Sequence, residues 1–156
     1  MLKDREVVET TLRVRYAETD AMGVVYHTNY LIWFEVGRGE YMRQKGSDYA
    51  RLEAQGFYLP VSEVGARFIA PARYGDLVTV RTWVEELRSR SLTLAYEVVM
   101  QATGQVLATG YTKHICADRT GRVRVIPREL RELLGQVRAV PSPVRVVSQE
   151  GDEGAE

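Results

Sequence analysis

The sequence predicts an α+β domain in which a curved antiparallel sheet wraps one long helix. Two observations lead to this prediction: an apolar pattern of helical period covers residues 30–41, and strand-like runs separated by short turns follow it. A helix that is apolar over much of its surface is enclosed by other elements, and consecutive strands joined by tight turns pair antiparallel. A length of 156 residues suffices for one such core without metal or disulfide staples.

The first predicted element is a strand over residues 7–16. Its apolar side carries Leu12, Val14 and Tyr16, which alternate with threonine and arginine and should face the core. The loop that follows leads directly into the central helix.

The central helix has an apolar face and a more polar face. Thr28 or Asn29 can serve as its N-cap. The residues expected to face the sheet recur at three- and four-residue steps and are Tyr30, Trp33, Phe34, Gly37 and Tyr41. The opposite face is marked by Glu35, Arg38 and Lys45.

Two glycines inside this helix need a reason. Gly37 and Gly39 would each cost roughly 1 kcal/mol relative to alanine. Either a neighbouring strand approaches the helix backbone closely there, or the glycines are merely tolerated.

The remaining elements follow from alternation and from turn residues. Strands are expected over residues 58–69, 77–87, 92–100 and 105–117, of which the last three form an antiparallel meander. A short helix over 49–55, an edge strand over 122–125 and a helix over 128–134 complete the domain. The domain therefore spans residues 1–135, and residues 136–156 are expected to be an extended or disordered tail.

Composition excludes several classes of protein. Lysine plus arginine (21) equals aspartate plus glutamate (21), so a broad surface for nucleic acid or anionic membrane is not supported. Cys116 is the single cysteine, which excludes an intramolecular disulfide scaffold. The start of the chain has no apolar stretch of signal-peptide length, and no run approaches the roughly 18 apolar residues of a membrane span. We therefore expect a soluble, cytoplasmic protein.

The loop before the central helix carries the most distinctive residues of the chain. The run Asp20 to Tyr30, DAMGVVYHTNY, is followed by Trp33-Phe34-Glu35 and by Arg38. This pattern closely resembles the signature of the 4-hydroxybenzoyl-CoA thioesterase family of hotdog-fold acyl-CoA thioesterases, with the Tol-Pal-associated short-chain branch nearest. The resemblance extends from about residue 12 to about residue 134, including PARYGD at 71–76.

The resemblance implies a hotdog fold and the hydrolysis of acyl-CoA to free acid and coenzyme A. It also implies a homodimer or a tetramer of dimers with the active site near the subunit interface. An open sheet leaves edge strands unpaired, and a second copy can protect one of them, which agrees with this expectation. No cofactor is expected, because coenzyme A is part of the substrate.

Thioester hydrolysis needs a nucleophile or general base and donors for the oxyanion. Asp20 offers a carboxylate, and the backbone N–H groups at about 26–28 lie at the positive end of a helix. Family precedent places the oxyanion donor at the His27 amide. Asp20 could attack the carbonyl or activate water, and a turn or cap role is its structural alternative.

Neighbouring side chains could assist. The His27 imidazole could orient the thioester or protonate the leaving thiolate, or it could simply pack beside the helix start. The hydroxyls of Tyr16 and Tyr26 could assist, although core packing is the more common role of tyrosine. Glu18 is expected to be a solvated loop acid, and Asn29 a cap or a brace for the loop.

The phosphates of coenzyme A call for arginine or lysine at the mouth of the pocket. The candidates are Arg73, Arg88, Arg90 and Lys113. Two of them share the turn at 88–91 with two serines, so cations and hydroxyl donors occur together. Ordinary surface charge is the alternative for each.

Other chemistries lack a basis in the sequence. There is no Gly-x-Ser-x-Gly elbow and no zinc-binding pattern, and His114 and Cys116 lie too far apart along one strand face to act as a pair, so they should pack. A noncatalytic acyl-CoA-binding module on the same fold is the main alternative function. A dehydratase is a third possibility, but the helix-borne histidine pattern of that branch is not evident.

Overall fold

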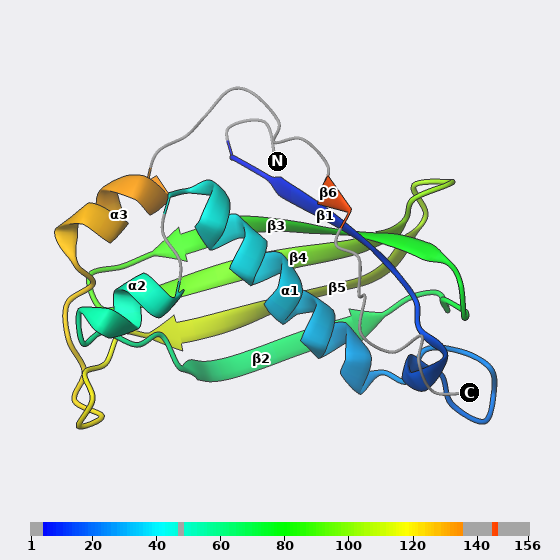
Figure 1. The fold of residues 1–156 in the computed structure, drawn as a ribbon, viewed down its shortest axis with the longest axis horizontal. Coiled ribbons are helices and arrows are strands. Elements are labelled where there is room, and N and C mark those ends of the chain that lie inside the picture. Colours follow the sequence, from blue (N-terminus) through cyan, green and yellow to red (C-terminus); the bar gives the residue numbers. More distant parts are fainter. Residues whose placement is uncertain (1–4, 47–48, 136–144, 147–156) are drawn as a thin grey trace.

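The computed structural model describes residues 5–46, 49–135 and 145–146 (Figure 1). The helices are α1 (Thr28–Gln44), α2 (Tyr49–Ala54) and α3 (Arg128–Gly135), and a 3-10 turn covers Tyr16–Glu18. The strands are β1 (Val8–Arg13), β2 (Val61–Phe68), β3 (Leu77–Leu87), β4 (Ser91–Met100), β5 (Val106–Ile115) and β6 (Arg145–Val146).

In the described part of the chain, the strands form one sheet in the order β2-β5-β4-β3-β1-β6. Every pairing is antiparallel except that of β6 with β1. Figure 1 shows α1 lying across one face of this curved sheet, with α2 and α3 at the end where α1 finishes. The predicted α+β fold and the β3-β4-β5 meander are therefore confirmed.

The predicted apolar face of α1 is buried in full. Its members Tyr30, Trp33, Phe34, Gly37 and Tyr41 all lie in the interior. The Phe34 ring stacks on Tyr96 of β4, with centroids 4.5 Å apart and planes 8° apart. The helix is thus held on the centre of the sheet by stacked aromatic rings.

The two glycines of α1 differ in their surroundings. A Cβ at Gly37 would lie 2.4 Å from Thr82 Oγ1 and 2.8 Å from Val80 Cγ1, so close approach to β3 explains this glycine. A Cβ at Gly39 would meet only the Arg43 guanidinium, at 3.7 Å, and close strand approach is wrong for that position.

The polar face of α1 was predicted less well. Lys45, the C-cap residue, is buried and forms an ion pair with buried Glu6, which precedes β1. A helical wheel cannot show this, because the partner carboxylate comes from a segment almost forty residues away in sequence. The N-cap of α1 is His27 rather than Thr28 or Asn29.

Further differences from the prediction concern element boundaries and the tail. The first strand ends at Arg13, because the chain turns into the 3-10 segment there. The predicted edge strand over 122–125 is reduced to one bridge between Ala117 and Val123. The predicted tail 136–156 lies outside the described residues except for β6, which pairs with Thr10 and Thr11.

No helix in the described ranges has both the length and the apolarity needed to cross a membrane.

Candidate active site

The loop before α1 is a small hairpin whose base is a hydrogen bond between residues 18 and 26. The Tyr26 N–H donates to Glu18 O at 2.8 Å, and the Asp20 N–H donates to Val24 O at 2.9 Å. The tip closes with the Gly23 N–H donating to Asp20 O, and Gly23 has a φ of 75°, which glycine adopts most easily. The hairpin connects Asp20 at its tip to the helix start at its base.

The Asp20 carboxylate is exposed and is oriented by its own turn. Oδ1 accepts from the Met22 N–H at 2.8 Å and more weakly from the Val24 N–H at 3.4 Å. Within the described residues, Oδ2 has no hydrogen-bond donor. The hydrogen bonds that form the turn therefore involve Oδ1 of Asp20, and Oδ2 stays available to react with a substrate.

The start of α1 presents two adjacent backbone donors. The Tyr26 and Asn29 N–H groups are used by Glu18 O and by Tyr26 O. Between them, the N–H groups of His27 and Thr28 have no backbone acceptor in the described part of the chain. Adjacent open N–H groups at the positive end of a helix suit a developing negative charge.

Aromatic rings surround this helix start. The His27 imidazole lies 4.5 Å from the Tyr26 ring and 5.8 Å from the Phe68 ring of β2, between centroids. It makes no hydrogen bond to any described residue. Phe68 also contacts Tyr30, with centroids 5.3 Å apart, so the end of β2 lies beside the start of α1.

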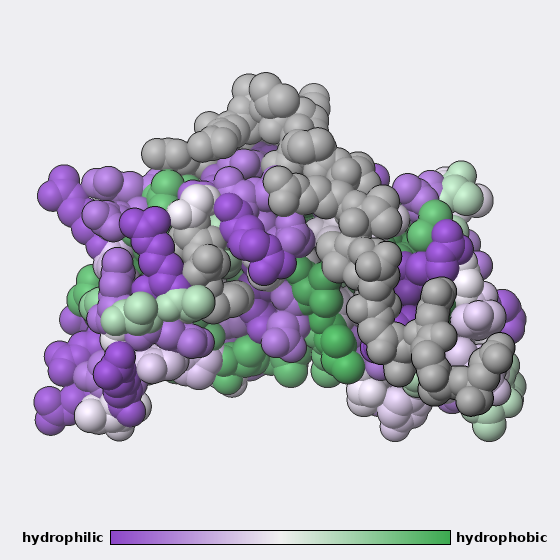
Figure 2. Space-filling model, in the orientation of Figure 1, coloured by the Kyte–Doolittle hydropathy of each residue, from purple (hydrophilic) through white to green (hydrophobic). Residues whose placement is uncertain are grey.

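The neighbouring surface is apolar. Figure 2 shows hydrophobic side chains exposed between the first half of α1 and β2. The exposed large apolar residues of these two elements and of the residues beside them are Tyr26, Ile32, Val61, Val64, Phe68 and Ile69. An acyl chain or a second protein surface could cover them.

Tyr16 does not fill the core position that its alternation predicts. Its side chain is 77% exposed, and its ring lies edge-on to the Tyr74 ring, with centroids 5.8 Å apart. The chain leaves the strand after Arg13, so the alternation ends before Tyr16. Tyr26 is also exposed, and core packing is wrong for both tyrosines.

Glu18 was expected to be a solvated acid, and this is wrong. It is 1% exposed, and its Oε2 accepts from the Trp33 Nε1–H at 2.8 Å. Its backbone oxygen also accepts from Asn29 Nδ2 at 3.0 Å, which confirms the bracing role of Asn29. The available signal was Trp33 itself, because a buried indole N–H needs an acceptor.

The predicted cations lie at two ends of the sheet. Arg73 is beside the hairpin, since it forms a bridge with Val24. Arg88, Arg90 and Lys113 are at the other end of the sheet, and the 11 residues of β3 alone span about 35 Å. Arg88 forms an exposed ion pair with Glu86 at 2.6 Å. Of the four predicted cations, one chain therefore brings only Arg73 close to the hairpin that carries Asp20.

His114 and Cys116 are buried, which confirms the expectation that they pack. His114 Nδ1 lies 2.9 Å from Leu59 O and must donate to it, so in neutral His114 the Nε2 accepts from the Thr112 hydroxyl at 2.8 Å. Thr112 then accepts from Tyr96 Oη at 2.6 Å. Burial lowers the pKa of His114 to about 4, and the positive charge of Arg38 adds to this effect.

This depressed pKa predicts a loss of stability in acid. Unfolded His114 binds a proton below about pH 6.5, whereas the folded side chain does so only near pH 4, so stability falls as the pH falls through this window. Between pH 7 and 4.5, we expect wild type to lose about 2 kcal/mol more than the His114→Gln variant. Urea unfolding of both proteins at the two pH values measures this difference. Parallel pH dependences of the two proteins would contradict it.

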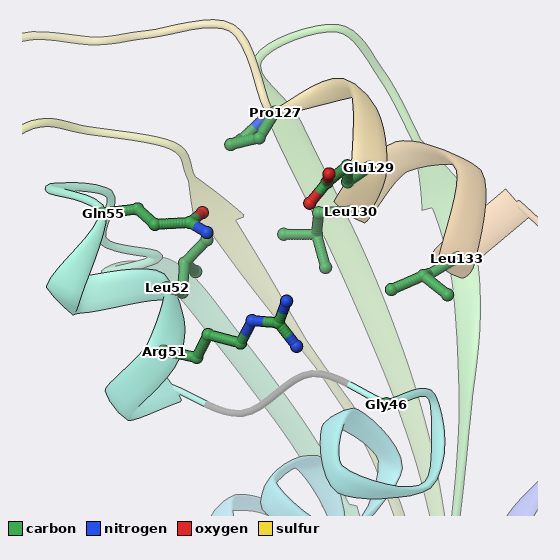
Figure 3. Close-up of a pocket in the computed structure, with 8 residues that line it drawn as sticks. All are labelled: Gly46, Arg51, Leu52, Gln55, Pro127, Glu129, Leu130 and Leu133. Atoms are coloured by element: carbon green, nitrogen blue, oxygen red, sulfur yellow. The ribbon is translucent and has the colours of Figure 1, made fainter.

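A small cavity lies far from the hairpin. It has a volume of about 70 Å³ and lies between α2 and α3, with Arg51 pointing toward Glu129 and Leu130 (Figure 3). Neither Asp20 nor His27 lines it. The hairpin site itself lies open on the surface of one chain.

Comparison with known proteins gives consistent matches over most of the chain. Residues 14–144 match the family model described as the thioesterase-like superfamily. A protein of Bacillus subtilis called putative acyl-CoA thioesterase YneP is 36% identical over 113 residues, which are 72% of this chain and 81% of that protein.

Solved structures extend the comparison to the fold. A hypothetical protein of Thermus thermophilus, TT1821, is 41% identical with a TM-score of 0.79, over 84% of this chain and 99% of that chain. A DHNA-CoA thioesterase from Staphylococcus aureus is 34% identical with a TM-score of 0.79, over 83% of this chain and 89% of that chain. These matches confirm the predicted hotdog fold.

Proposed function

The chain belongs to the thioesterase-like superfamily, and we propose that it hydrolyses acyl-CoA to the free acid and coenzyme A by the combined action of Asp20 and the helix-start amides. The predicted class, a thioester hydrolase, is confirmed by this membership and by its relatives. One observation carries the proposed mechanism: a single hairpin joins a carboxylate with an open oxygen to two open N–H groups.

In the proposed reaction, the thioester carbonyl oxygen accepts hydrogen bonds from the His27 and Thr28 N–H groups. One such donor lowers an acyl-transfer barrier by roughly 3 kcal/mol. The open Oδ2 of Asp20 either attacks the carbonyl carbon, in which case water then hydrolyses the acyl–Asp20 anhydride and restores the carboxylate, or takes a proton from a water molecule that attacks the carbonyl carbon directly. The thiolate of coenzyme A leaves, and the His27 imidazole is close enough to the helix start to protonate it.

A second copy of the chain would complete this site. β2 is an edge of the described sheet, and nearly all of its residues are exposed, whereas β6 covers part of the β1 edge. Two-fold pairing of β2 with a second β2 runs antiparallel and places Val61 of the partner subunit beside Phe68. We propose a homodimer of this kind, or a tetramer of such dimers.

Because the two β2 strands would pair antiparallel, the sheet of the second copy would run in the opposite direction. The end of that sheet that carries the distant cations would therefore lie beside the helix start of the first copy. Val61, Ile115 and Arg90 lie at one end of the sheet, since β2, β5 and the β3–β4 turn are neighbours there. In the dimer, Arg88 of the partner subunit and Arg90 of the partner subunit would therefore approach His27. They could bind the phosphates of coenzyme A together with Arg73 of the same chain, and Lys113 of the partner subunit lies in the same region.

Charge reversal tests this assignment. The double variant Arg88→Glu, Arg90→Glu should raise the KM for acyl-CoA about tenfold or more, because like charges would then face each other. The KM for an N-acetylcysteamine thioester, which lacks the nucleotide, should change little. Equal losses on both substrates would contradict phosphate binding by Arg88 and Arg90, and an unchanged KM would leave Arg73 and Lys113 as the candidate phosphate ligands.

The activity itself is tested by thiol release from a panel of acyl-CoAs. The panel includes benzoyl-, 4-hydroxybenzoyl-, butanoyl- and palmitoyl-CoA, so it compares aromatic with short and long aliphatic acyl groups. Turnover of any member supports the proposal, and binding without turnover favours the noncatalytic module. The narrower resemblance to the 4-hydroxybenzoyl-CoA family and its Tol-Pal branch stays a prediction, as does a cytoplasmic location.

A further inference from the structure

Glu18 is a buried acid that the proposed mechanism does not use. It lies at the end of the 3-10 turn, two residues before Asp20, and only 1% of its surface is exposed. Burying a carboxylate is costly unless hydrogen bonds compensate for the lost water. The hydrogen bonds that Glu18 makes therefore indicate the role of this buried carboxylate.

The oxygens of this residue accept four hydrogen bonds. The carboxylate accepts from the Arg15 N–H at 2.8 Å and from the Trp33 Nε1–H at 2.8 Å, and Arg15 Nε lies 3.6 Å from Oε1. The backbone oxygen accepts from the Tyr26 N–H at 2.8 Å and from Asn29 Nδ2 at 3.0 Å. Glu18 thus contacts the strand exit, the hairpin base and two turns of α1.

The segments that Glu18 connects differ in how firmly they are held. Trp33 is fully buried and is fixed by the packing of α1 on the sheet, whereas the tip of the hairpin is exposed. The short segment from residue 18 to residue 20 carries Asp20 outward from this anchor. The open N–H groups of His27 and Thr28 belong to the helix side. The Glu18 carboxylate therefore lies where the hairpin is attached to the helix.

We infer that Glu18 is a positioning residue that holds the Asp20 carboxylate at its working distance from the helix-start amides. This inference rests on the proposed function, because it acts through Asp20. Reacting groups that are misplaced by about 1 Å lose on the order of a hundredfold in rate. A loosened hairpin should therefore lower kcat and leave substrate binding nearly unchanged.

Glu18→Gln tests the inference with little change of shape. The glutamine oxygen can accept from one of the two donors, and its NH2 group then faces the other donor. We expect kcat to fall at least about tenfold for whichever of benzoyl-CoA and butanoyl-CoA is turned over faster, with KM changed less than about threefold. The matched control is Thr19→Ala, which removes a hydrogen bond to Tyr16 O inside the loop and should leave kcat within about twofold.

Two further measurements separate positioning from simple stability. Amide exchange at Tyr26 should be at least about tenfold faster in Glu18→Gln, since the hairpin base would open more often. In an Asp20→Asn background, Glu18→Gln should lower kcat by less than about twofold further, because both changes act on the same group. A lower melting temperature with unchanged kcat and unchanged Tyr26 exchange would overturn the inference.

The outcomes also separate this inference from the proposed function. If Asp20→Asn abolishes turnover while Glu18→Gln is normal, only the positioning role is wrong. If Asp20→Asn is fully active and Glu18→Gln is not, the mechanism proposed for Asp20 fails, and Glu18 does not act through it.

Discussion

Replacement of Asp20 by asparagine is expected to lower kcat by at least about a hundredfold, which corresponds to about 2.7 kcal/mol of barrier. The substitution removes the base or nucleophile, but the amide oxygen can still accept from the Met22 N–H that Oδ1 now binds at 2.8 Å. The hairpin should therefore keep its shape, and KM should change little.

Steady-state thiol release measures this effect, and thermal unfolding serves as the control. An unchanged melting temperature with lost turnover is the predicted combination. Near-normal turnover of Asp20→Asn would reduce Asp20 to the turn-forming role that its Oδ1 contacts already show.

The second large effect concerns packing of the central helix. Gly37→Ala should destabilise the protein by about 3 kcal/mol, since its Cβ would lie 2.4 Å from Thr82 Oγ1 and 2.8 Å from Val80 Cγ1. The helix would have to move away from β3. Denaturant unfolding measures the change in the free energy of unfolding.

Gly39→Ala is the matched control in the same helix. Its Cβ would meet only the flexible Arg43 guanidinium, so the better helix propensity of alanine should stabilise the protein by up to about 1 kcal/mol. Opposite signs for the two variants are predicted. Equal effects would mean that close contact with β3 does not explain Gly37.

The fold could be predicted because its main signals are local. The apolar face of α1 follows a helical period, and β4 alternates strictly, so both are visible in a single sequence. The turn glycines with positive φ, such as Gly75 and Gly104, mark the ends of strands for the same reason. The pattern gives the core-facing residues of both elements, whereas Ala95 and Val99, in the other phase of β4, are also buried.

What the sequence did not show depends on partners from distant segments. Glu18 is buried because Trp33 supplies an indole donor, and Lys45 is buried because Glu6 supplies a carboxylate. A charged residue in a loop or at a helix end is predicted to be solvated unless its partner is known. Tyr16 shows the opposite error, since it was predicted to face the core but is exposed. The alternating sequence pattern continues past Arg13, where the strand ends.

The candidate site was predicted in part. Asp20, His27 and Arg73 lie together because one hairpin and one bridge connect them. Arg88, Arg90 and Lys113 do not join them within one chain, because β3 and its turn extend to the far end of the sheet. The proposed second copy would bring these side chains to the helix start, and sequence spacing cannot show such a symmetry relation.

The most direct test of the central claim is a structure of the Asp20→Asn variant with the acyl-CoA that wild type hydrolyses fastest. The account predicts that the thioester carbonyl oxygen lies about 2.7–3.1 Å from the N–H nitrogen of His27 or Thr28. The carbonyl carbon should face the amide side chain that replaces the Asp20 carboxylate. A thioester bound elsewhere, with these two amides facing only water, would contradict the account.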